Sequence, residues 1–300
     1  MKKIFVVGSI NIDLCMKSKR LPQIGETVAG ESFLINPGGK GANQAVAAAK
    51  LGGEVVFCGC VGDDVFGQQN KMQLKNYHVD ISNIRVIKNC STGVAVILLT
   101  DGDNRILLNS GANSLVGEED VDKLLTNAVQ GDILLTQGEI PISVTKYALK
   151  IAKQKGMTTI FNPAPAVIDL QSCYPYCDWI VPNESEIMIL TGLQNFKNAL
   201  DKIPVENKII TLGDKGYYYC GSSGEWQEKC PSVNVVDTTA AGDTFLGAFA
   251  VFLSKDYDIH EALKMASICA SLTCTKRGAQ QAVPTWQEVE NFLKIRGATF

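Results

Sequence analysis

Short apolar runs alternate with helix-like segments along most of this chain. Examples of the runs are KIFVVG, EVVFCG, DILLTQG and NKIITLG, and examples of the segments between them are GANQAVAAAKLGG and SVTKYALKIAKQKG. A strand, a helix and a second strand of the same sheet form a right-handed crossover, which makes the two strands parallel. The alternation therefore predicts an α/β fold in which a central, mostly parallel sheet is flanked by helices.

Two segments, residues 12–36 and 92–109, show the period-two alternation of antiparallel ribbons instead. The second contains Asp101-Gly102, a dipeptide typical of tight hairpin turns. Because both lie next to candidate site residues, we expect a small antiparallel β-lid over the ligand edge of the sheet, within a single α/β domain of residues 1–300. An exposed edge of this lid could pair with its own copy, which predicts a homodimer.

The composition points to a small-molecule partner. The chain carries 28 Lys and Arg against 31 Asp and Glu, whereas nucleic acid and anionic membranes require clustered basic residues. The first apolar run stops at Gly8, so it is too short for a signal peptide or a membrane span. The ten cysteines are dispersed without zinc-site spacing, and we expect reduced thiols in the cytoplasm.

A carboxylate stands where an apolar helix is expected to begin, in the stretch DTTAAGDTFLGAFAVF. It could simply be a favourable partner of the helix dipole. Alternatively, the small residues of this turn leave the backbone N–H groups of residues 240–243 open to an anion at the helix N-terminus. An acid beside a bound phosphate would repel it unless the acid accepted a proton from an attacking hydroxyl. Asp243 is therefore a candidate general base.

The glycine-rich stretch NPGGKGANQ, residues 36–44, is the second candidate site. It is not a Walker A loop, because Lys40 is followed by Gly41 and not by Ser or Thr. No Gly-x-Gly-x-x-Gly pattern follows the first strand, which weakens a dinucleotide-binding interpretation. The stretch is either a tight strand-to-helix turn or a place where the backbone approaches a ligand, with Lys40 and Asn43 as polar groups.

The chain resembles the PfkB family of carbohydrate kinases from Ile4 to about Pro284. The resemblance rests on seven motifs that occur in the family's order and approximate spacing: GSINID, GGKGAN, NPAPA, PNESE, TLGDKG, DTTAAGDTF and TKRGAQ. It is strongest to members that act on ribose, and it implies a three-layer α/β sandwich that phosphorylates D-ribose at O5 with ATP. It also implies that Asp243 is the base and that the N–H groups of Ala240, Ala241 and Gly242 stabilise the transferring phosphoryl group.

The same resemblance implies three sets of binding residues. The sugar contacts are Asn11, Asp13, Gly39, Lys40, Gly41, Asn43, Glu139 and Asp243. The nucleotide contacts are Asn183, Glu186, Thr211, Leu212, Gly213, Asp214, Lys215, Gly216, Gly242 and Ser267, with Glu186 organising Mg²⁺ through water. The K⁺ site comprises Asp237, Thr239, Thr273, Lys276, Gly278 and Ala282, mostly through backbone carbonyls, and Ala282 stands where the family has a serine.

For single members of these sets, a purely structural role is the alternative to ligand binding. Asn11 and Asp13 could be turn residues, and Glu139 could be a surface acid. Asn183 resembles an ordinary helix cap, a role that is compatible with nucleotide binding.

Three functional hypotheses are open at this stage. The first is a kinase that acts on ribose, favoured by Asn11 with Asp13, by GGKGAN and by Glu139. The second is a related kinase that acts on fructose, deoxyribose or a nucleoside such as adenosine. The third is a non-catalytic sensor of sugar or nucleotide. The third is disfavoured because a pure binder has no use for the base Asp243.

Overall fold

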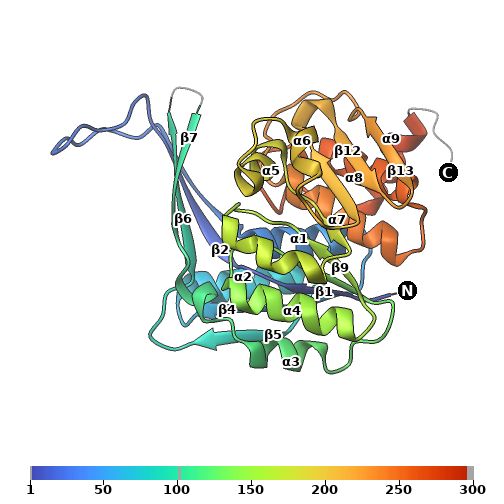
Figure 1. Cartoon of the computed structure of the whole chain (residues 1–300). Coiled ribbons are helices and arrows are strands. Elements are labelled where there is room, and N and C mark those ends of the chain that lie inside the picture. The colour runs from blue at the N-terminus through green and yellow to red at the C-terminus, as the bar shows by residue number, and fades with distance from the viewer. Residues whose placement is uncertain (1, 101–102, 296–300) are drawn as a thin grey trace.

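The structure, a computed structural model, describes residues 2–100 and 103–295, and its strands form two sheets of different size (Figure 1). The strands of the large sheet are β1 (Ile4–Val7), β4 (Val55–Gly62), β5 (Asp80–Ile87), β8 (Ile133–Thr136), β9 (Thr158–Phe161), β10 (Trp179–Ile180), β11 (Asn207–Thr211), β12 (Tyr217–Gly221) and β13 (Gly224–Glu228). Their order is β13-β12-β11-β10-β9-β8-β1-β4-β5. All neighbours from β11 to β5 pair in parallel, and β12 and β13 are added antiparallel.

Helices cover both faces of the large sheet. The helices are α1 (Lys40–Lys50), α2 (Val65–Asn76), α3 (Glu118–Leu125), α4 (Ile142–Gln154), α5 (Glu184–Thr191), α6 (Phe196–Leu200), α7 (Ala241–Ser254), α8 (Ile259–Thr273) and α9 (Trp286–Ile295). Short 3₁₀ turns span Gly111–Leu115, Ile168–Tyr176 and Gly213–Lys215.

The two faces of the sheet are visible in the alternation of β1. Ile4 and Val6 pack in one core with α1, α7 and α8, whereas Phe5 and Val7 pack in a second core with α3 and α4. A parallel sheet that is buried on both faces needs apolar side chains on both, which explains the continuous runs in the sequence. The predicted α/β fold with a mostly parallel sheet between helices is confirmed.

The small sheet stands away from the body in Figure 1 and consists of two antiparallel hairpins. Its strands are β2 (Asn11–Lys17), β3 (Ser32–Gly38), β6 (Gly93–Thr100) and β7 (Asp103–Asn109), in the order β3-β2-β6-β7. The predicted antiparallel pairing holds for β2 with β3 and for β6 with β7, and the hairpins join through a parallel β2–β6 pair. The Asp101-Gly102 turn lies outside the described residues.

One part of the first ribbon differs from the sequence prediction. The alternating pattern extends through residues 25–31, but β3 begins only at Ser32, and residues 18–31 form bends and irregular structure. Pro22 cannot donate a ladder hydrogen bond, and Gly25 has a φ of +80°, which takes the chain out of extended geometry. A local ion pair between Arg20 and Glu26 holds this loop instead.

Close packing of α1 against α7 sets the geometry at the ligand edge. A Cβ atom on Gly247 would lie 2.5 Å from the carbonyl oxygen of Gln44 and 2.6 Å from the Cβ of Ala47. The absence of a side chain at this position therefore lets the two helices approach. Their first turns come together although they are some 200 residues apart in the chain.

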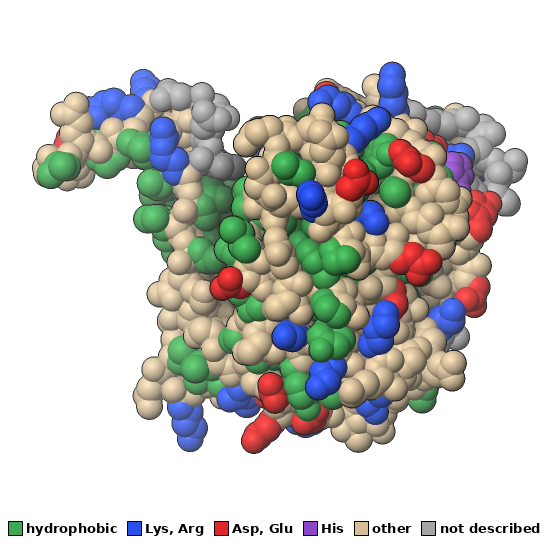
Figure 2. All heavy atoms as spheres, in the orientation of Figure 1, with side chains coloured by type: hydrophobic (Ala, Val, Ile, Leu, Met, Phe, Trp, Pro, Cys, Tyr) green, Lys and Arg blue, Asp and Glu red, His purple; other side chains and the backbone are tan. Residues whose placement is uncertain are grey.

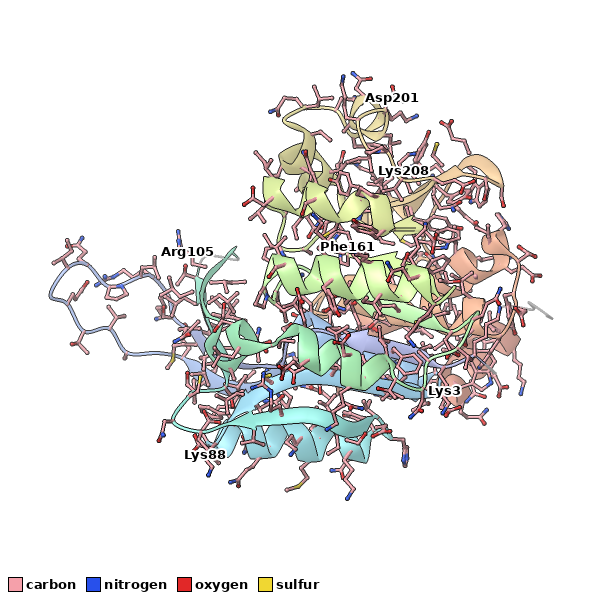
Figure 3. The ribbon with its side chains drawn as sticks, turned by 60° about the horizontal axis from the view of Figure 1, so that its bottom comes forward. Lys3, Lys88, Arg105, Phe161, Asp201 and Lys208 are labelled. Atoms are coloured by element: carbon pink, nitrogen blue, oxygen red, sulfur yellow. The ribbon has the colours of Figure 1, made fainter. Side chains whose placement is uncertain are left out.

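The sheet has its topological switch point between β1 and β8. The chain leaves β1 toward β4 and β5 on one side, and later returns to place β8, β9 and β10 on the other side. Ligands of open α/β sheets bind beyond the carboxyl ends of the strands at such a point. Figure 3 shows Phe161 at the end of β9 in the body, apart from Arg105 on the projecting small sheet.

Among the described residues, no helix is long and apolar enough to cross a membrane.

Candidate active site

Glu139 joins the loop after β8 to the glycine-rich turn. Its Oε2 accepts hydrogen bonds from the hydroxyl of Ser9, which follows β1, and from the backbone N–H of Lys40 at 3.0 Å. Glu139 is half-buried at the switch point, so it is not the surface acid that the sequence left open. Its second oxygen, Oε1, is the atom that remains for a ligand.

The glycine-rich turn brings the backbone against the loop after β1. Gly39 has a φ of +90°, and a Cβ there would lie 2.7 Å from the backbone nitrogen of Asn11. A Cβ on Gly41 would lie 2.7 Å from the Cα of Gly8. Gly41, predicted as a sugar contact, thus packs against the chain itself, and its contribution is close backbone packing.

Asn11 is fixed by a residue that the sequence analysis did not single out. The side chain of Asn113, which is 1% exposed, donates to Asn11 Oδ1 at 2.7 Å. The Asn113 side chain also accepts a hydrogen bond from the N–H of Ile10 at 2.9 Å and donates one to the Ile10 carbonyl at 3.1 Å. Asn11 is therefore held by the core and is not a simple turn residue.

Asp13 lies on β2 with its carboxylate close to Gly38 of β3, where a Cβ would come within 2.4 Å of Asp13 Oδ2. Burial, together with the charges of Glu139 and Asp243, raises the pKa of Asp13 to about 7. Three carboxylates therefore share one neighbourhood, and Asp13 is poised to bind hydroxyl groups as either donor or acceptor near neutral pH.

Lys40 supplies the positive charge in this acidic neighbourhood. Burial alone would lower the pKa of Lys40, but the charges of Asp243, Glu139 and Glu186 outweigh it, so the pKa is raised. The ammonium group therefore stays charged at neutral pH and lies within the field of the acids predicted for the sugar and of the acid predicted for the nucleotide.

Asp243 occupies the first turn of α7. Ala240, the N-cap residue, has a φ of +60°, a conformation that a non-glycine residue adopts only under constraint. Asn43 donates to Asp243 Oδ2 and Gln44 donates to Asp243 Oδ1, both at 3.0 Å. The base predicted from the sequence is thus anchored through both carboxylate oxygens.

The predicted anion hole differs in one donor from the sequence expectation. The N–H of Ala241 donates to the Thr238 carbonyl at 3.2 Å, so this group is already engaged within the turn. A Cβ on Gly242 would meet nothing within 4 Å, which shows open space in front of the turn. In the described part of the chain, the first-turn N–H groups of Gly242 and Asp243 have no backbone partner, as the first turn of a helix leaves them, so they stay candidates for the predicted anion hole.

Two adjoining cavities meet at this turn. A cavity of about 220 Å³ is lined by Lys40, Asn162, Val181, Asn183, Glu186, Thr211, Thr238, Ala240, Ala241, Gly242, Asp243 and Leu246. A groove of about 560 Å³ shares Asn183, Thr211, Thr238, Ala241 and Gly242 with it and continues past Ser267. The first cavity has the size and polarity for phosphate groups, and the second has the size for a nucleoside.

The groove brings together most of the predicted nucleotide residues. Its lining includes Asn183, Thr211, Gly213, Asp214, Gly216, Gly242 and Ser267. Leu212 is instead buried in the second core, and Lys215 is exposed on the 3₁₀ turn.

Glu186 has a structural role in addition to its predicted one. It forms a capping box with Asn183: the N–H of Glu186 donates to Asn183 Oδ1 at 2.8 Å, and the N–H of Asn183 donates to Glu186 Oε2 at 2.7 Å. Burial raises the pKa of Glu186, against the opposing effects of the Asn183 N–H and Lys40. A half-buried carboxylate that retains Oε1 suits the water-mediated binding that Mg²⁺ prefers.

Asp237 links two segments of the predicted cation site. Its Oδ1 accepts from the N–H and hydroxyl of Thr239 at 2.9 and 2.7 Å, and its Oδ2 accepts from the N–H of Gly278 at 2.9 Å. Burial would raise the pKa of Asp237, but these hydrogen bonds and Arg277 lower it overall. The carboxylate is therefore ionised and has further lone pairs, which fits a hard monovalent cation.

The other predicted cation residues lie in different settings. Thr273 and Ala282 are buried, and the Thr273 hydroxyl donates to Thr244 Oγ1 at 3.0 Å. The side chain of Lys276 forms an ion pair with Glu288 at 2.5 Å. Only its backbone is compatible with a cation ligand. Among the described residues, no group of three or more His, Cys, Asp and Glu side chains could hold a metal ion.

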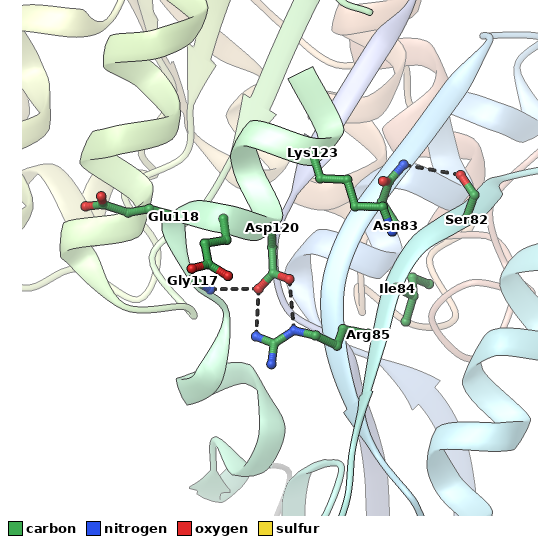
Figure 4. Close-up of a pocket in the computed structure, with 9 residues that line it drawn as sticks. Ser82, Asn83, Ile84, Arg85, Gly117, Glu118, Asp120 and Lys123 are labelled. Atoms are coloured by element: carbon green, nitrogen blue, oxygen red, sulfur yellow. Dashed lines mark hydrogen bonds and ion pairs between the residues drawn. The ribbon is translucent and has the colours of Figure 1, made fainter. Parts of the chain in front are cut away.

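A cavity of about 680 Å³ lies elsewhere, between β5 and α3 (Figure 4). It contains a bidentate ion pair in which Arg85 Nε and Nη2 donate to the Asp120 carboxylate at 2.9 and 2.7 Å. Glu118 and Lys123 also line it. None of the residues predicted for the site lies in this cavity, and its ion pair stabilises the first turn of α3.

Sequence reasoning missed a set of buried amides around Asp243. They are Gln44, Gln137, Asn162 and Gln280, all at most 6% exposed. The one signal for them was a glutamine in an otherwise Ala-rich helix that is buried on most sides.

Comparisons with known proteins agree with this geometry. The sequence profile of the pfkB family of carbohydrate kinases matches residues 1–286. Ribokinase of Schizosaccharomyces pombe is 38% identical over 100% of both chains, and deoxyribokinase of Salmonella typhi is 33% identical over 97% of this chain and 99% of that protein. The structure of Arabidopsis thaliana ribokinase complexed with ribose and ATP has a TM-score of 0.89 and 32% identity, covering 98% of this chain and 99% of that chain.

The raised pKa of Asp13 predicts a pH-dependent stability. In the unfolded chain an Asp titrates near 3.9, so the unfavourable charging of Asp13 in the folded protein develops as pH rises from about 4 to 7. We expect the free energy of unfolding of Asp13→Asn, relative to that of wild type, to rise by about 1–2 kcal/mol between pH 5 and pH 8. Urea unfolding without ligand measures this difference. Asp201→Asn, which removes an exposed carboxylate, serves as control, and a gain that does not vary with pH would contradict the prediction.

Proposed function

Because the chain belongs to the pfkB family of carbohydrate kinases, we propose that it transfers the γ-phosphoryl group of ATP to O5 of D-ribose. The products are D-ribose 5-phosphate and ADP. The observation that carries this proposal is the position of Asp243, whose anchored carboxylate lines the phosphate-sized cavity in the first turn of α7. Since ATP is the phosphoryl donor, we place the reaction in the cytoplasm.

In this reaction Asp243 accepts the proton of the sugar hydroxyl as its oxygen attacks the γ-phosphorus. The first-turn N–H groups of Gly242 and Asp243 face the charge that develops on the phosphoryl oxygens, and Lys40 adds a fixed positive charge. Mg²⁺, held through water by Glu186, would neutralise nucleotide phosphate charge. No covalent nucleophile takes part, since positioning and electrostatics supply most of the rate in phosphoryl transfer.

On the sugar side, the groups proposed to contact hydroxyls come from the loop after β1, the glycine-rich turn and the loop after β8. Asn11 is fixed by Asn113, and Glu139 is fixed by Ser9 and Lys40. Such held polar groups discriminate strongly, because a sugar that lacks one hydroxyl leaves a buried partner unpaired. The small sheet formed by β2, β3, β6 and β7 is proposed as the lid over this site.

Deoxyribose is the strongest competing acceptor, since deoxyribokinase of Salmonella typhi is also similar over nearly the whole chain. Fructose and adenosine are the further alternatives within the family. A non-catalytic sensor would not require the anchored base at Asp243.

Purified protein with Mg²⁺, K⁺ and ATP tests the acceptor. We expect kcat/KM for D-ribose to exceed that for 2-deoxyribose, fructose and adenosine by at least about tenfold, because a missing hydroxyl leaves polar groups of the site unpaired. A coupled assay that monitors ADP release gives the ratio of the kcat/KM values. If another acceptor wins, the ribose assignment fails while the kinase stands, and if no acceptor reacts, the sensor is favoured.

Activation by K⁺ is a separate proposal that rests on Asp237. Its ionised carboxylate ties the turn before α7 to Gly278, so a cation there would fix the shape of the anion hole. The residues proposed to hold the ion are Asp237, Thr239, Thr273, Lys276, Gly278 and Ala282, the last five through backbone carbonyls.

Replacing K⁺ by tetramethylammonium at equal ionic strength should lower kcat, because this ion is too large to enter a ring of carbonyls. We expect a loss of at least about fivefold, with Na⁺ measured in parallel. Equal rates with K⁺ and tetramethylammonium would sink the cation proposal and leave the role of Asp243 unaffected.

We further propose that two copies pair through the small sheet. Its outer strands β3 and β7 expose consecutive apolar residues, namely Phe33, Leu34, Ile35, Ile106, Leu107 and Leu108. Figure 2 shows hydrophobic side chains gathered along the projecting part of the molecule. Apolar patches and unpaired strand edges of this kind favour association, and a second copy offers the matching edge.

Charging this patch should separate the copies. Leu107 is 70% exposed, and we expect Leu107→Lys to shift the protein from dimer to monomer in sedimentation velocity. Val129 is 62% exposed outside the small sheet, so Val129→Lys is a matched control that should remain dimeric. A monomeric wild-type protein at micromolar concentration would rule out this interface.

A further inference from the structure

We propose that a buried chain of amide side chains holds the Asp243 carboxylate in its reactive orientation, with Gln44 and Gln137 as positioning residues. This inference rests on the proposed function, in which Asp243 is the base. It adds residues that touch neither the sugar nor the nucleotide and that act through the carboxylate.

The first layer of the network consists of the two amides on Asp243. Gln44 Nε2 donates to Oδ1 and Asn43 Nδ2 donates to Oδ2, each at 3.0 Å. Both come from consecutive positions in the first turn of α1, so one rigid element fixes both oxygens. A carboxylate bound at both oxygens cannot rotate about its Cβ–Cγ bond without losing one of these hydrogen bonds.

The second layer fixes the first. Gln137 Nε2, directly after β8, donates to Gln44 Oε1 at 2.6 Å, and Gln44 Nε2 also donates to Asn162 Oδ1 at 3.2 Å. Asn162, directly after β9, in turn donates to the Val181 carbonyl at 2.8 Å. On the other side, Gln280 donates to Asn43 Oδ1 at 3.3 Å.

The charge of Asp243 determines which way each amide points. An ionised carboxylate only accepts hydrogen bonds, so Gln44 must present its NH₂ group to Asp243. Its oxygen then faces away and requires a donor, which only the NH₂ group of Gln137 supplies in the described structure. The orientation of Gln137 is therefore a consequence of the charge two hydrogen bonds away.

The burial of these groups argues that they serve the site and not simply stability. Gln44, Gln137 and Gln280 are 0% exposed. Gln137 Oε1 and Gln280 Oε1 are buried and find no hydrogen-bond partner among residues 2–100 and 103–295, and an unsatisfied buried acceptor costs about 1–3 kcal/mol. Apolar side chains would fill the same space without this cost. The retained amides are explained by donors that reach Asp243 directly from Gln44, or through Gln44 and Asn43 in the case of Gln137 and Gln280.

The charged surroundings of Asp243 make such positioning necessary. Lys40 attracts the carboxylate, while Asp13 and Glu186 repel it. Without the amide donors, these opposing forces alone would set the orientation of the carboxylate. Misplacement of a catalytic group by about 1 Å can lower the rate by about 100-fold.

The decisive variants are Gln44→Met and Gln137→Met, which keep side-chain length and remove the amide. We expect kcat with ribose to fall about 10–100-fold for Gln44→Met and about 3–30-fold for Gln137→Met. KM for ribose and for ATP should stay within about threefold of wild type, because neither residue contacts a substrate. A KM increase with unchanged kcat in both variants would overturn the inference.

Asn70→Leu is the matched control, because Asn70 is a 1% exposed amide on α2 whose buried oxygen likewise has no partner in the part of the chain that the structure describes. Asn70→Leu should alter thermal stability without changing kcat. If kcat falls as much in Asn70→Leu as in Gln44→Met and Gln137→Met, the loss of any buried amide lowers kcat through stability, and the inference fails. If Gln44→Met does not fold, as judged by circular dichroism, Gln137→Met decides.

A double-variant cycle separates this inference from the proposed function. Asp243→Ala should lower kcat by several orders of magnitude, and near-normal turnover in this variant would remove the proposed base itself. In the Asp243→Ala background, Gln137→Met should cost less than about twofold, since it has no carboxylate left to position. The same fold-loss in both backgrounds would show that Gln137 acts independently of Asp243 and would overturn the inference alone.

Discussion

The contact between the first turns of α1 and α7 is the interaction on which the site depends. Gly247 allows the two helices to approach until a Cβ would overlap the Gln44 carbonyl. That approach brings Asn43 and Gln44 within hydrogen-bond distance of Asp243. One helix carries the turn proposed to bind the sugar, and the other carries the proposed anion hole. A small change in their packing would therefore alter both halves of the site together.

Charge balance is the second constraint on this edge of the sheet. Asp13, Glu139 and Asp243 share one neighbourhood, and burial, together with repulsion from the other two carboxylates, raises the pKa of Asp13. Lys40 offsets part of it, as its own raised pKa indicates. Such an arrangement is unfavourable for the empty protein but suits a polyol and a phosphate, because hydroxyl groups take up the acceptors while the lysine and the helix N-terminus receive the anion.

Several residues combine a role in folding with a proposed chemical role. Their sequence motifs mark the segments that form the site, but the structure gives some of the individual groups other partners. Glu186 closes the capping box of α5 and leaves one oxygen toward the phosphate cavity. Ala241 was expected to donate to the phosphoryl group, yet its N–H is used inside the turn. Gly41 belongs to the sugar motif but packs on Gly8. A motif identifies the segment that forms a site, whereas the direction of each group depends on its neighbours.

The sequence by itself determined the α/β architecture, the pfkB family and the position of Asp243, because apolar periodicity and motif order are local properties of the chain. It also located the two ribbons, although the strand pattern of residues 25–31 was not realised and the parallel joining of the hairpins was not foreseen. Only the tertiary structure decided which groups bind the Asp243 carboxylate. Gln44, Gln137, Asn162 and Gln280 are distant in sequence and carry no shared pattern. They meet because parallel strands end at one edge, where buried amides must find partners in other segments.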